Sequence, residues 1–220
     1  LAASAFVLLA AGSAEAYEIK TSKKGMPVRW GQGELEMHLS MESEPHGIPT
    51  GMAEAQVRAA FDAWSPSLGD ELELSVESAD EVLPSVQDGK NVVRWVTDPS
   101  HARLDPDALA TTFLTYRTST GEILEGDIVV NAVSHDWGVV NPVTCADVYD
   151  LQNVLTHEVG HLLGLAHSEQ EPESTMFPSA AMCETKKREL EQDDVDGATF
   201  LYGTPSLSIP STKDPAELVG

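Results

Sequence analysis

The sequence has 220 residues, enough for one domain with a sizeable core or at most two small domains. Its 41% hydrophobic and 22% charged residues are typical of a soluble globular protein, but 36 acidic and 13 basic residues give a net charge of -23. We expect no nucleic-acid or anionic-membrane partner, since binding to either needs a basic surface. The excess acidic side chains form either a solvated surface or ligands for divalent cations.

The first sixteen residues have the composition of a secretory signal peptide. An apolar stretch from Ala5 to Ala11 precedes small residues ending in Ala14-Glu15-Ala16, the pattern of a cleavage site. The initiator methionine and basic n-region are missing, so we expect the sequence to begin inside the signal. The alternative is an N-terminal helix that stays in the fold, but nothing caps it. The predicted location is secreted, periplasmic or extracellular, with no membrane contact after signal removal.

The two cysteines, Cys145 and Cys183, fit an exported protein. Export implies an oxidising compartment, where an even cysteine count favours one disulfide. The bridge would close a loop of about 38 residues, which the chain-entropy model values at roughly 3–4 kcal/mol. The alternative is two unpaired thiols.

The first two-thirds of the chain are predicted to form strands around one long helix. Residues 34–40 and 71–77 alternate polar and apolar side chains, and residues 91–96, 109–116 and 126–131 are rich in strand formers. Thr50 can cap the helix, which Pro66 stops. Its apolar face consists of Val57, Ala60, Phe61 and Trp64.

Two further helices are expected in the last third. Asp147 is a plausible N-cap for a helix with a wide apolar stripe that ends near Gly164. A third helix fits residues 190–202 and is closed by Gly203. Residues 204–220 are rich in Pro and Ser and are interpreted as a tail or linker. Residues 17–203 would then form one domain.

The stretch THEVGHLLGLAHS, residues 156–168, carries three of the seven histidines. His157 and His161 are four residues apart, so a helix projects both from one face, where two imidazoles can reach one zinc ion at about 2.0–2.1 Å. Gly164 can take a positive φ and turn the chain, which allows His167 to return as a third ligand. Three protein ligands leave one position open, as in catalytic rather than structural zinc sites.

Glu158 is adjacent to the two helical ligands and is not needed as a ligand itself. Its carboxylate can accept a proton from a water molecule whose pKa the metal lowers to about 7. The alternative is a core helix with incidental histidines. The full pattern HExxHxxGxxH arises by chance on the order of once in ten thousand such chains, which favours the catalytic metal site.

The sequence resembles a known family through several motifs. HEVGHLLGLAHS followed by STMFP resembles the metzincin metallopeptidases, and Ser168 directly after the third histidine resembles their matrixin branch, the matrix metalloproteinases. Met176 matches the Met-turn, which in that family lies beneath the zinc. LEQDDVDGATFLYG resembles the matrixin C-terminal helix, in which Asp193 and Asp194 would tie the helix to the Met-turn region or to a chain terminus. The resemblance covers roughly residues 27–203.

The resemblance implies an α+β fold. It has a twisted, mostly parallel sheet with an antiparallel edge strand, an active-site helix, the Met-turn and a C-terminal helix. It also implies a substrate that extends along the edge strand, with Pro178 in the pocket wall. The edge-strand residues assigned to substrate binding are Ala108, Leu109, Ala110, Thr111 and Thr112.

The sequence also departs from the family pattern. It has no PRCGxPD propeptide motif, so it resembles a bacterial-type member without a cysteine switch. Val129 stands near the place of a ligand histidine for a second, structural zinc, and His101, Asp105 and His135 are expected to be surface residues. The pocket wall in that family usually reads Pro-x-Tyr, whereas this chain has Ser179-Ala180 after Pro178. The resemblance therefore does not predict the shape of the pocket. Calcium is plausible, but no run of residues locates it.

We therefore predict a secreted, monomeric endopeptidase with one catalytic zinc, acting on protein or peptide substrates. His157, His161 and His167 would bind the metal, and Glu158 would be the general base. Two alternatives stay open: a zinc-containing binding or inhibitor module without turnover, and a zinc hydrolase of non-peptide amides.

Overall fold

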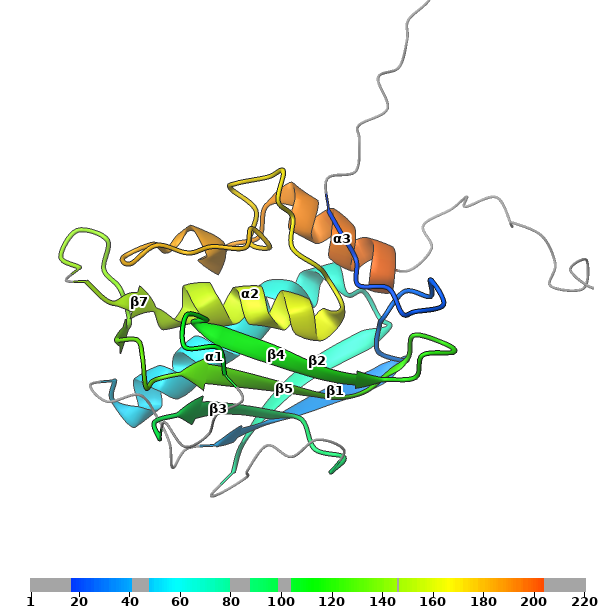
Figure 1. Cartoon of the computed structure of the whole chain (residues 1–220), viewed down its shortest axis with the longest axis horizontal. Helices are drawn as coiled ribbons and strands as arrows, with labels where there is room; N and C mark the ends of the chain where they lie inside the picture. Colours follow the sequence, from blue (N-terminus) through cyan, green and yellow to red (C-terminus); the bar gives the residue numbers. More distant parts are fainter. Residues whose placement is uncertain (1–16, 41–47, 80–87, 99–103, 146, 204–220) are drawn as a thin grey trace, which may run out of the picture.

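The computed structural model describes residues 17–40, 48–79, 88–98, 104–145 and 147–203 (Figure 1). The predicted signal peptide 1–16, the tail 204–220 and His101 lie outside the described residues. None of the helices in the described part of the chain has the length and apolar character needed to cross a bilayer.

Five strands form one sheet in the order β2-β1-β3-β5-β4. Four of them are mutually parallel, and β4 (Ala110–Tyr116) pairs antiparallel with β5 (Ile123–Asn131) at one edge. The other parallel strands are β1 (Gly33–Ser40), β2 (Leu72–Ala79) and β3 (Val92–Val96). The expected strands are all present within a few residues of their predicted bounds. The predicted mostly parallel sheet with one antiparallel edge strand is confirmed.

Two helices pack side by side on one face of this sheet (Figure 1). α1 (Thr50–Trp64) buries its predicted apolar face, and α2 (Leu151–Leu163) lies between α1 and β4. The indole of Trp64 donates a hydrogen bond of 2.8 Å to the carbonyl of Thr156, which joins the two helices inside the core. α2 is therefore held between a buried helix and the edge strand.

The predicted N-cap of α2 was wrong by three residues. Asp147 has φ 50° and stands outside the helix, whereas Asp150 is the N-cap and accepts a hydrogen bond of 2.8 Å from the Asn153 amide. Two-residue strands, β6 (Trp137–Gly138) and β7 (Tyr149–Asp150), precede the helix and were too short to show a sequence pattern. At α1, Pro49 is the N-cap and Thr50 is the first helical residue.

The last α-helix of the described part follows α2. α3 (Gln192–Tyr202) starts two residues later than expected, and Gly203 closes it through a hydrogen bond to Thr199. Two short 3-10 helices complete the described fold, η2 (Ser65–Ser67) and η3 (Lys186–Arg188). The Tyr202 hydroxyl donates to the carbonyl of Leu163, so α3 satisfies an end carbonyl of α2.

α2 ends at Gly164 in the left-handed conformation that the sequence predicts, with φ 101°. A Cβ atom at this position would lie 2.0 Å from the carbonyl oxygen of Val28, so the turn requires glycine for space as well as for φ. The chain then runs beside the N-terminal segment. The amide of Lys20 donates a hydrogen bond to the carbonyl of Gly164, and the amide of Ala166 donates one to the carbonyl of Glu18. These contacts fix the loop that carries His167.

We expect Gly164→Ala to lower the free energy of unfolding by roughly 2–4 kcal/mol, because it adds a backbone clash to the cost of a positive φ. Gly25→Ala is the matched control: Gly25 has φ 74° but open space around its Cβ position. That variant should lose only about 1 kcal/mol. Denaturant unfolding of both variants tests the turn, and equal losses would show that the clash with Val28 does not matter.

Candidate active site

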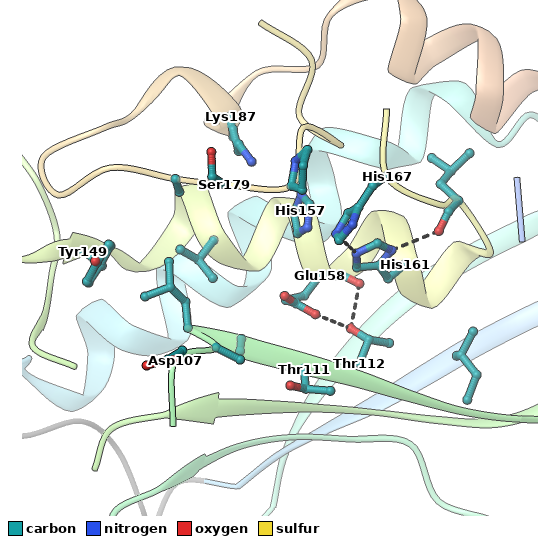
Figure 2. Close-up of a pocket in the computed structure, with 18 of the residues that line it drawn as sticks. Asp107, Thr111, Thr112, Tyr149, His157, Glu158, His161, His167, Ser179 and Lys187 are labelled. Carbon is teal, nitrogen blue, oxygen red and sulfur yellow. Dashed lines mark hydrogen bonds between the residues drawn. The ribbon is translucent and has the colours of Figure 1, made fainter. Parts of the chain in front are cut away.

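α2 places His157, Glu158 and His161 on the side of the helix that faces a surface cleft (Figure 2). His157 and His161 project from successive turns, and the loop after Gly164 brings His167 back beside them. The candidate ligand atoms of the three histidines lie within 4.8 Å of one another. The structure therefore brings together all three residues that the sequence assigned to one metal ion.

The hydrogen bonds of two histidines fix which ring nitrogen carries the proton. Nδ1 of His157 lies 2.7 Å from the carbonyl oxygen of Thr175, and Nδ1 of His161 lies 3.0 Å from that of Leu165. A carbonyl can only accept, so Nδ1 is the donor in both rings, and in the neutral ring Nε2 keeps a lone pair. This is the arrangement that metal-binding histidines use.

The environment keeps the three imidazoles neutral. Burial lowers the pKa of His157 well below its ordinary value, and it lowers the pKa of His161 to about 4. The pKa of His167 is lowered as well, again mainly by burial. Neutral imidazole is the form that binds a metal ion, so the site needs no deprotonation before binding.

The donor set fits zinc. Two nitrogens bound to one tetrahedral zinc at about 2.0–2.1 Å lie about 3.3–3.4 Å apart. The Nε2 atoms of His161 and His167 are 3.0 Å apart, and every pair of candidate ligand atoms in the group lies within 4.8 Å. Small ring rotations would bring three nitrogens onto one tetrahedron. In the part of the chain that the structure describes, this is the single group of three such residues that could hold a metal ion.

Glu158 is buried at the floor of the cleft and faces the edge strand. Burial raises the pKa of its carboxyl to about 7, although the hydrogen bond from Thr112 and the positive charge of Lys187 both lower this pKa. The Thr112 hydroxyl lies 2.7 Å from Oε2 of Glu158 and 3.0 Å from its main-chain oxygen. Thr112, which the sequence assigned to substrate binding, lines the cleft, and its hydroxyl also contacts Glu158 (Figure 2).

Met176 packs directly against α2 between the two helical histidines. A Cβ atom at Gly160 would lie 2.2 Å from the Met176 sulfur, so the glycine of HEVGH makes room for this side chain. Asp194 of α3 holds the turn, accepting hydrogen bonds from the amides of Thr175 and Met176 and from the Ser174 hydroxyl. The same turn supplies the carbonyl that orients His157.

The cleft above the histidines has a volume of about 520 Å³. β4 and the residues before it form one wall, and the loop after Met176 forms the other (Figure 2). All the predicted substrate-contact positions line it: Ala108, Leu109, Ala110, Thr111, Thr112 and Pro178. Lys20 and Lys187 also line it, and neither stood out in the sequence, because a lysine within a charged run such as Lys186-Lys187-Arg188 is usually solvated.

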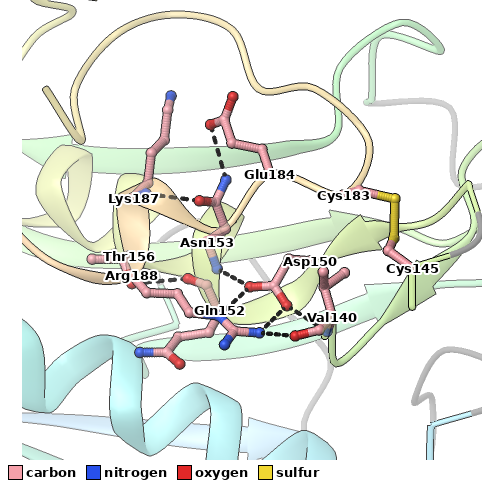
Figure 3. Close-up of polar contacts among 10 residues, drawn as sticks. All are labelled: Val140, Cys145, Asp150, Gln152, Asn153, Thr156, Cys183, Glu184, Lys187 and Arg188. Atoms are coloured by element: carbon pink, nitrogen blue, oxygen red, sulfur yellow. Dashed lines mark hydrogen bonds and ion pairs between the residues drawn. A yellow bond between two sulfur atoms is a disulfide. The ribbon is translucent and has the colours of Figure 1, made fainter. Parts of the chain in front are cut away.

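A disulfide joins Cys145 and Cys183, as the sequence predicts (Figure 3). It links the loop before α2 to the loop that forms one wall of the cleft. Close by, Arg188 binds the carboxylate of Asp150, the N-cap of α2, at 2.5 and 2.8 Å. The covalent and ionic links therefore tie the same loop to the start of the active-site helix.

Two of the other predicted surface residues lie within the described part. Asp105 is exposed, as expected. His135 is half-buried, and its ring packs edge-on against that of Tyr149. Val129, at the expected place of a second-zinc ligand, is buried in β5.

Comparison with known proteins defines the class of this fold and site. The family model described as Matrixin matches residues 29–203. The chain therefore belongs to the matrixin family of peptidases, which confirms the resemblance noted in the sequence.

Individual relatives match shorter segments. Human neutrophil collagenase is 45% identical over 73 residues, which cover 31% of this chain and 15% of the collagenase. Metalloendoproteinase 1-MMP of Arabidopsis thaliana is 52% identical over 63 residues, or 28% of this chain and 17% of its own. Human matrix metalloproteinase-16 is 35% identical over 101 residues, which cover 46% of this chain and 16% of the metalloproteinase. The matches thus span less than a fifth of each of these relatives.

We expect Asp194→Asn to lower the free energy of unfolding by about 2–3 kcal/mol and to weaken zinc binding, because an amide cannot accept all the bonds that the carboxylate accepts. Asp196→Asn on the same helix is the control, since Asp196 is exposed. Thermal unfolding with and without zinc tests both effects. Equal behaviour of the two variants would exclude a role for Asp194 in holding the Met176 turn.

Replacing both cysteines by serine should cost roughly 3–4 kcal/mol of stability, since the closed loop of 38 residues would no longer restrict the unfolded chain. Urea unfolding of the oxidised wild type and the double variant measures this. The histidine site should still bind zinc, because no sulfur contacts it. A loss of zinc without a loss of stability would contradict this interpretation.

Proposed function

We propose that this chain is a zinc-dependent endopeptidase of the matrixin type that acts outside the cytoplasm on peptide bonds. The single observation that supports this most is the joint arrangement of three neutral imidazoles, two of them oriented by carbonyls, with a buried carboxyl group that no ligand position requires. The disulfide fits an exported protein.

His157, His161 and His167 would hold the zinc ion. When bound, zinc supplies a Lewis acid that polarises the scissile carbonyl and lowers the pKa of a water molecule. The two carbonyl-anchored rings keep their free nitrogens near their binding positions, so only small ring rotations are needed when the metal enters.

Glu158 would act as the general base. A carboxyl with a pKa of about 7 is better matched to proton transfer at neutral pH than an exposed carboxyl. The Thr112 hydroxyl positions one oxygen of Glu158, which leaves the other to take a proton from the attacking water and deliver it to the leaving amine.

The edge of the sheet would bind the substrate. β4 pairs with β5 on one side only and is last in the strand order, so its other edge is turned toward the cleft. An extended peptide adding to this edge gains main-chain hydrogen bonds, and side-chain pockets give the selectivity.

The alternative of a zinc-binding module without turnover fits less well. Burying the carboxyl of Glu158 raises its pKa, which is a cost that a pure binding site has no reason to bear. Hydrolysis of small amides is separated from peptidase activity by assaying casein and small amides together. Calcium stays a prediction without a location.

We expect Glu158→Gln to lower the rate of casein hydrolysis by about 10²–10⁴-fold while one zinc per chain stays bound, because the variant keeps the ligands but loses the base. Glu171→Gln, at an exposed carboxyl beyond His167, should keep full activity. Metal analysis of each sample accompanies the assay. An unchanged rate in zinc-loaded Glu158→Gln would refute the mechanism.

A further inference from the structure

Lys187 is a lysine whose side chain is almost entirely buried, with an exposed fraction of 1%. It lies in η3, and its amide donates a hydrogen bond of 2.8 Å to the side chain of Asn153 in the first turn of α2. Its side chain lines the cleft and extends toward His157 (Figure 2). Lys187 therefore stands at the end of the cleft next to the start of α2, beside the proposed catalytic residues.

The ammonium of Lys187 is only partly satisfied. Among the described residues it donates one hydrogen bond, to the carbonyl of Phe177, and it is in none of the ion pairs. An ammonium has three donors, so two remain for other partners. Burial lowers the pKa of Lys187 to about 8, so the group still carries its charge at neutral pH.

The charges of Glu184, Asp194 and Glu158 act on Lys187 and favour its charged form, but none of these carboxylates forms a direct ion pair with it. Val154, Pro178 and Ala180 are apolar or small and line the same cavity. A buried charge is costly unless a hydrogen-bonded counter-charge accompanies it. A carboxylate that enters the cleft would supply that counter-charge and would use the free donors.

The direction of the cleft shows which substrate residue reaches Lys187. A Cβ atom at Gly126 would meet the side chains of Leu114 in β4 and Leu162 in α2, so these two side chains lie close together. Thr112, two residues earlier in β4, contacts Glu158, which is one turn earlier in α2. β4 and α2 therefore run in the same direction, with Lys187 near the start of both. A peptide bound antiparallel to β4 runs toward Lys187 after it passes Glu158. The substrate residues on the C-terminal side of the cleaved bond therefore lie nearest to Lys187.

We propose that Lys187 determines substrate specificity, and that the cleft selects an Asp or Glu side chain on the residue that directly follows the cleaved bond. This inference rests on the proposed peptidase function and names the substrate class for it. The side chain of Ala180 is small, so the charge at Lys187 becomes the main recognition feature of this pocket.

The net charge of -23 acts in the opposite direction, because it repels acidic peptides at long range. That repulsion is screened beyond about 8 Å at physiological ionic strength, whereas a buried contact is screened far less. We therefore expect the local contact to decide selectivity at 0.15 M salt, roughly the physiological value.

The test uses synthetic peptides that differ only in the residue after the cleaved bond, with Glu, Gln, Leu or Lys there. For the zinc-loaded wild type, kcat/KM for the Glu peptide should exceed that for the isosteric Gln peptide about tenfold, as expected for one charge-assisted hydrogen bond. Lys187→Met should remove the difference and favour Leu, and Lys187→Glu should favour Lys. Lys186→Met is the matched control, since Lys186 is exposed, and it should keep the wild-type profile.

A second readout separates this inference from the proposed function. Uncleaved fluorescent peptides are titrated into zinc-loaded Glu158→Gln, where the Glu peptide should bind about tenfold more tightly than the Gln peptide. Equal affinities and equal wild-type kcat/KM values for the two peptides would overturn the role of Lys187, even if casein is cleaved. If the wild type cleaves no peptide but the binding preference is present, the peptidase proposal fails and the acid-selective pocket stands. A preference for an acidic residue before the cleaved bond would overturn the assigned direction.

Discussion

Two carbonyl oxygens, those of Thr175 and Leu165, determine what the histidine site can do. Each accepts a hydrogen bond from Nδ1 of a helical histidine, so each fixes the tautomer and directs the other nitrogen inward. Much of the surrounding structure serves to hold these two carbonyls. Asp194 anchors the turn that contains Thr175, and Gly164 with its close approach to Val28 sets the path of Leu165.

This arrangement explains why the fold brings distant segments to one place. The N-terminal segment hydrogen-bonds to the loop after α2, α3 bonds to the end of α2, and the disulfide joins the two flanks of the motif. Each of these contacts restrains a different end of a short stretch of chain. The imidazoles are therefore oriented in the protein itself, and a metal ion would enter a site that already has nearly the right spacing.

Much of this could be predicted from the sequence, because the signals were local. The spacing of His157 and His161 depends only on helical geometry, the turn at Gly164 only on backbone freedom, and the strands on alternation. The N-cap was misplaced because Asp147 and Asp150 are equally good capping residues by type, and their sequence positions do not show that Asp150 binds the Asn153 amide and Arg188. The two-residue strands before α2 were too short to leave a pattern.

What the sequence could not show were contacts between residues far apart in the chain. The bond between Thr112 and Glu158 joins a strand to a helix, and no spacing rule connects them. Lys187 belongs to a charged run that predicts solvent exposure, and its burial follows only from how η3 packs against the first turn of α2. In the proposals above, Thr112 holds the base and Lys187 selects the substrate, so substrate selection is the part of the proposed function that sequence patterns predict least well.

X-ray absorption at the zinc edge of the purified chain would test the central claim most directly. The account predicts one zinc with three imidazole nitrogens and one oxygen ligand at about 2.0–2.1 Å, and a loss of this signal in His161→Ala. A sulfur ligand at about 2.3 Å, or an unchanged spectrum in that variant, would contradict the assignment of His157, His161 and His167 as the metal site.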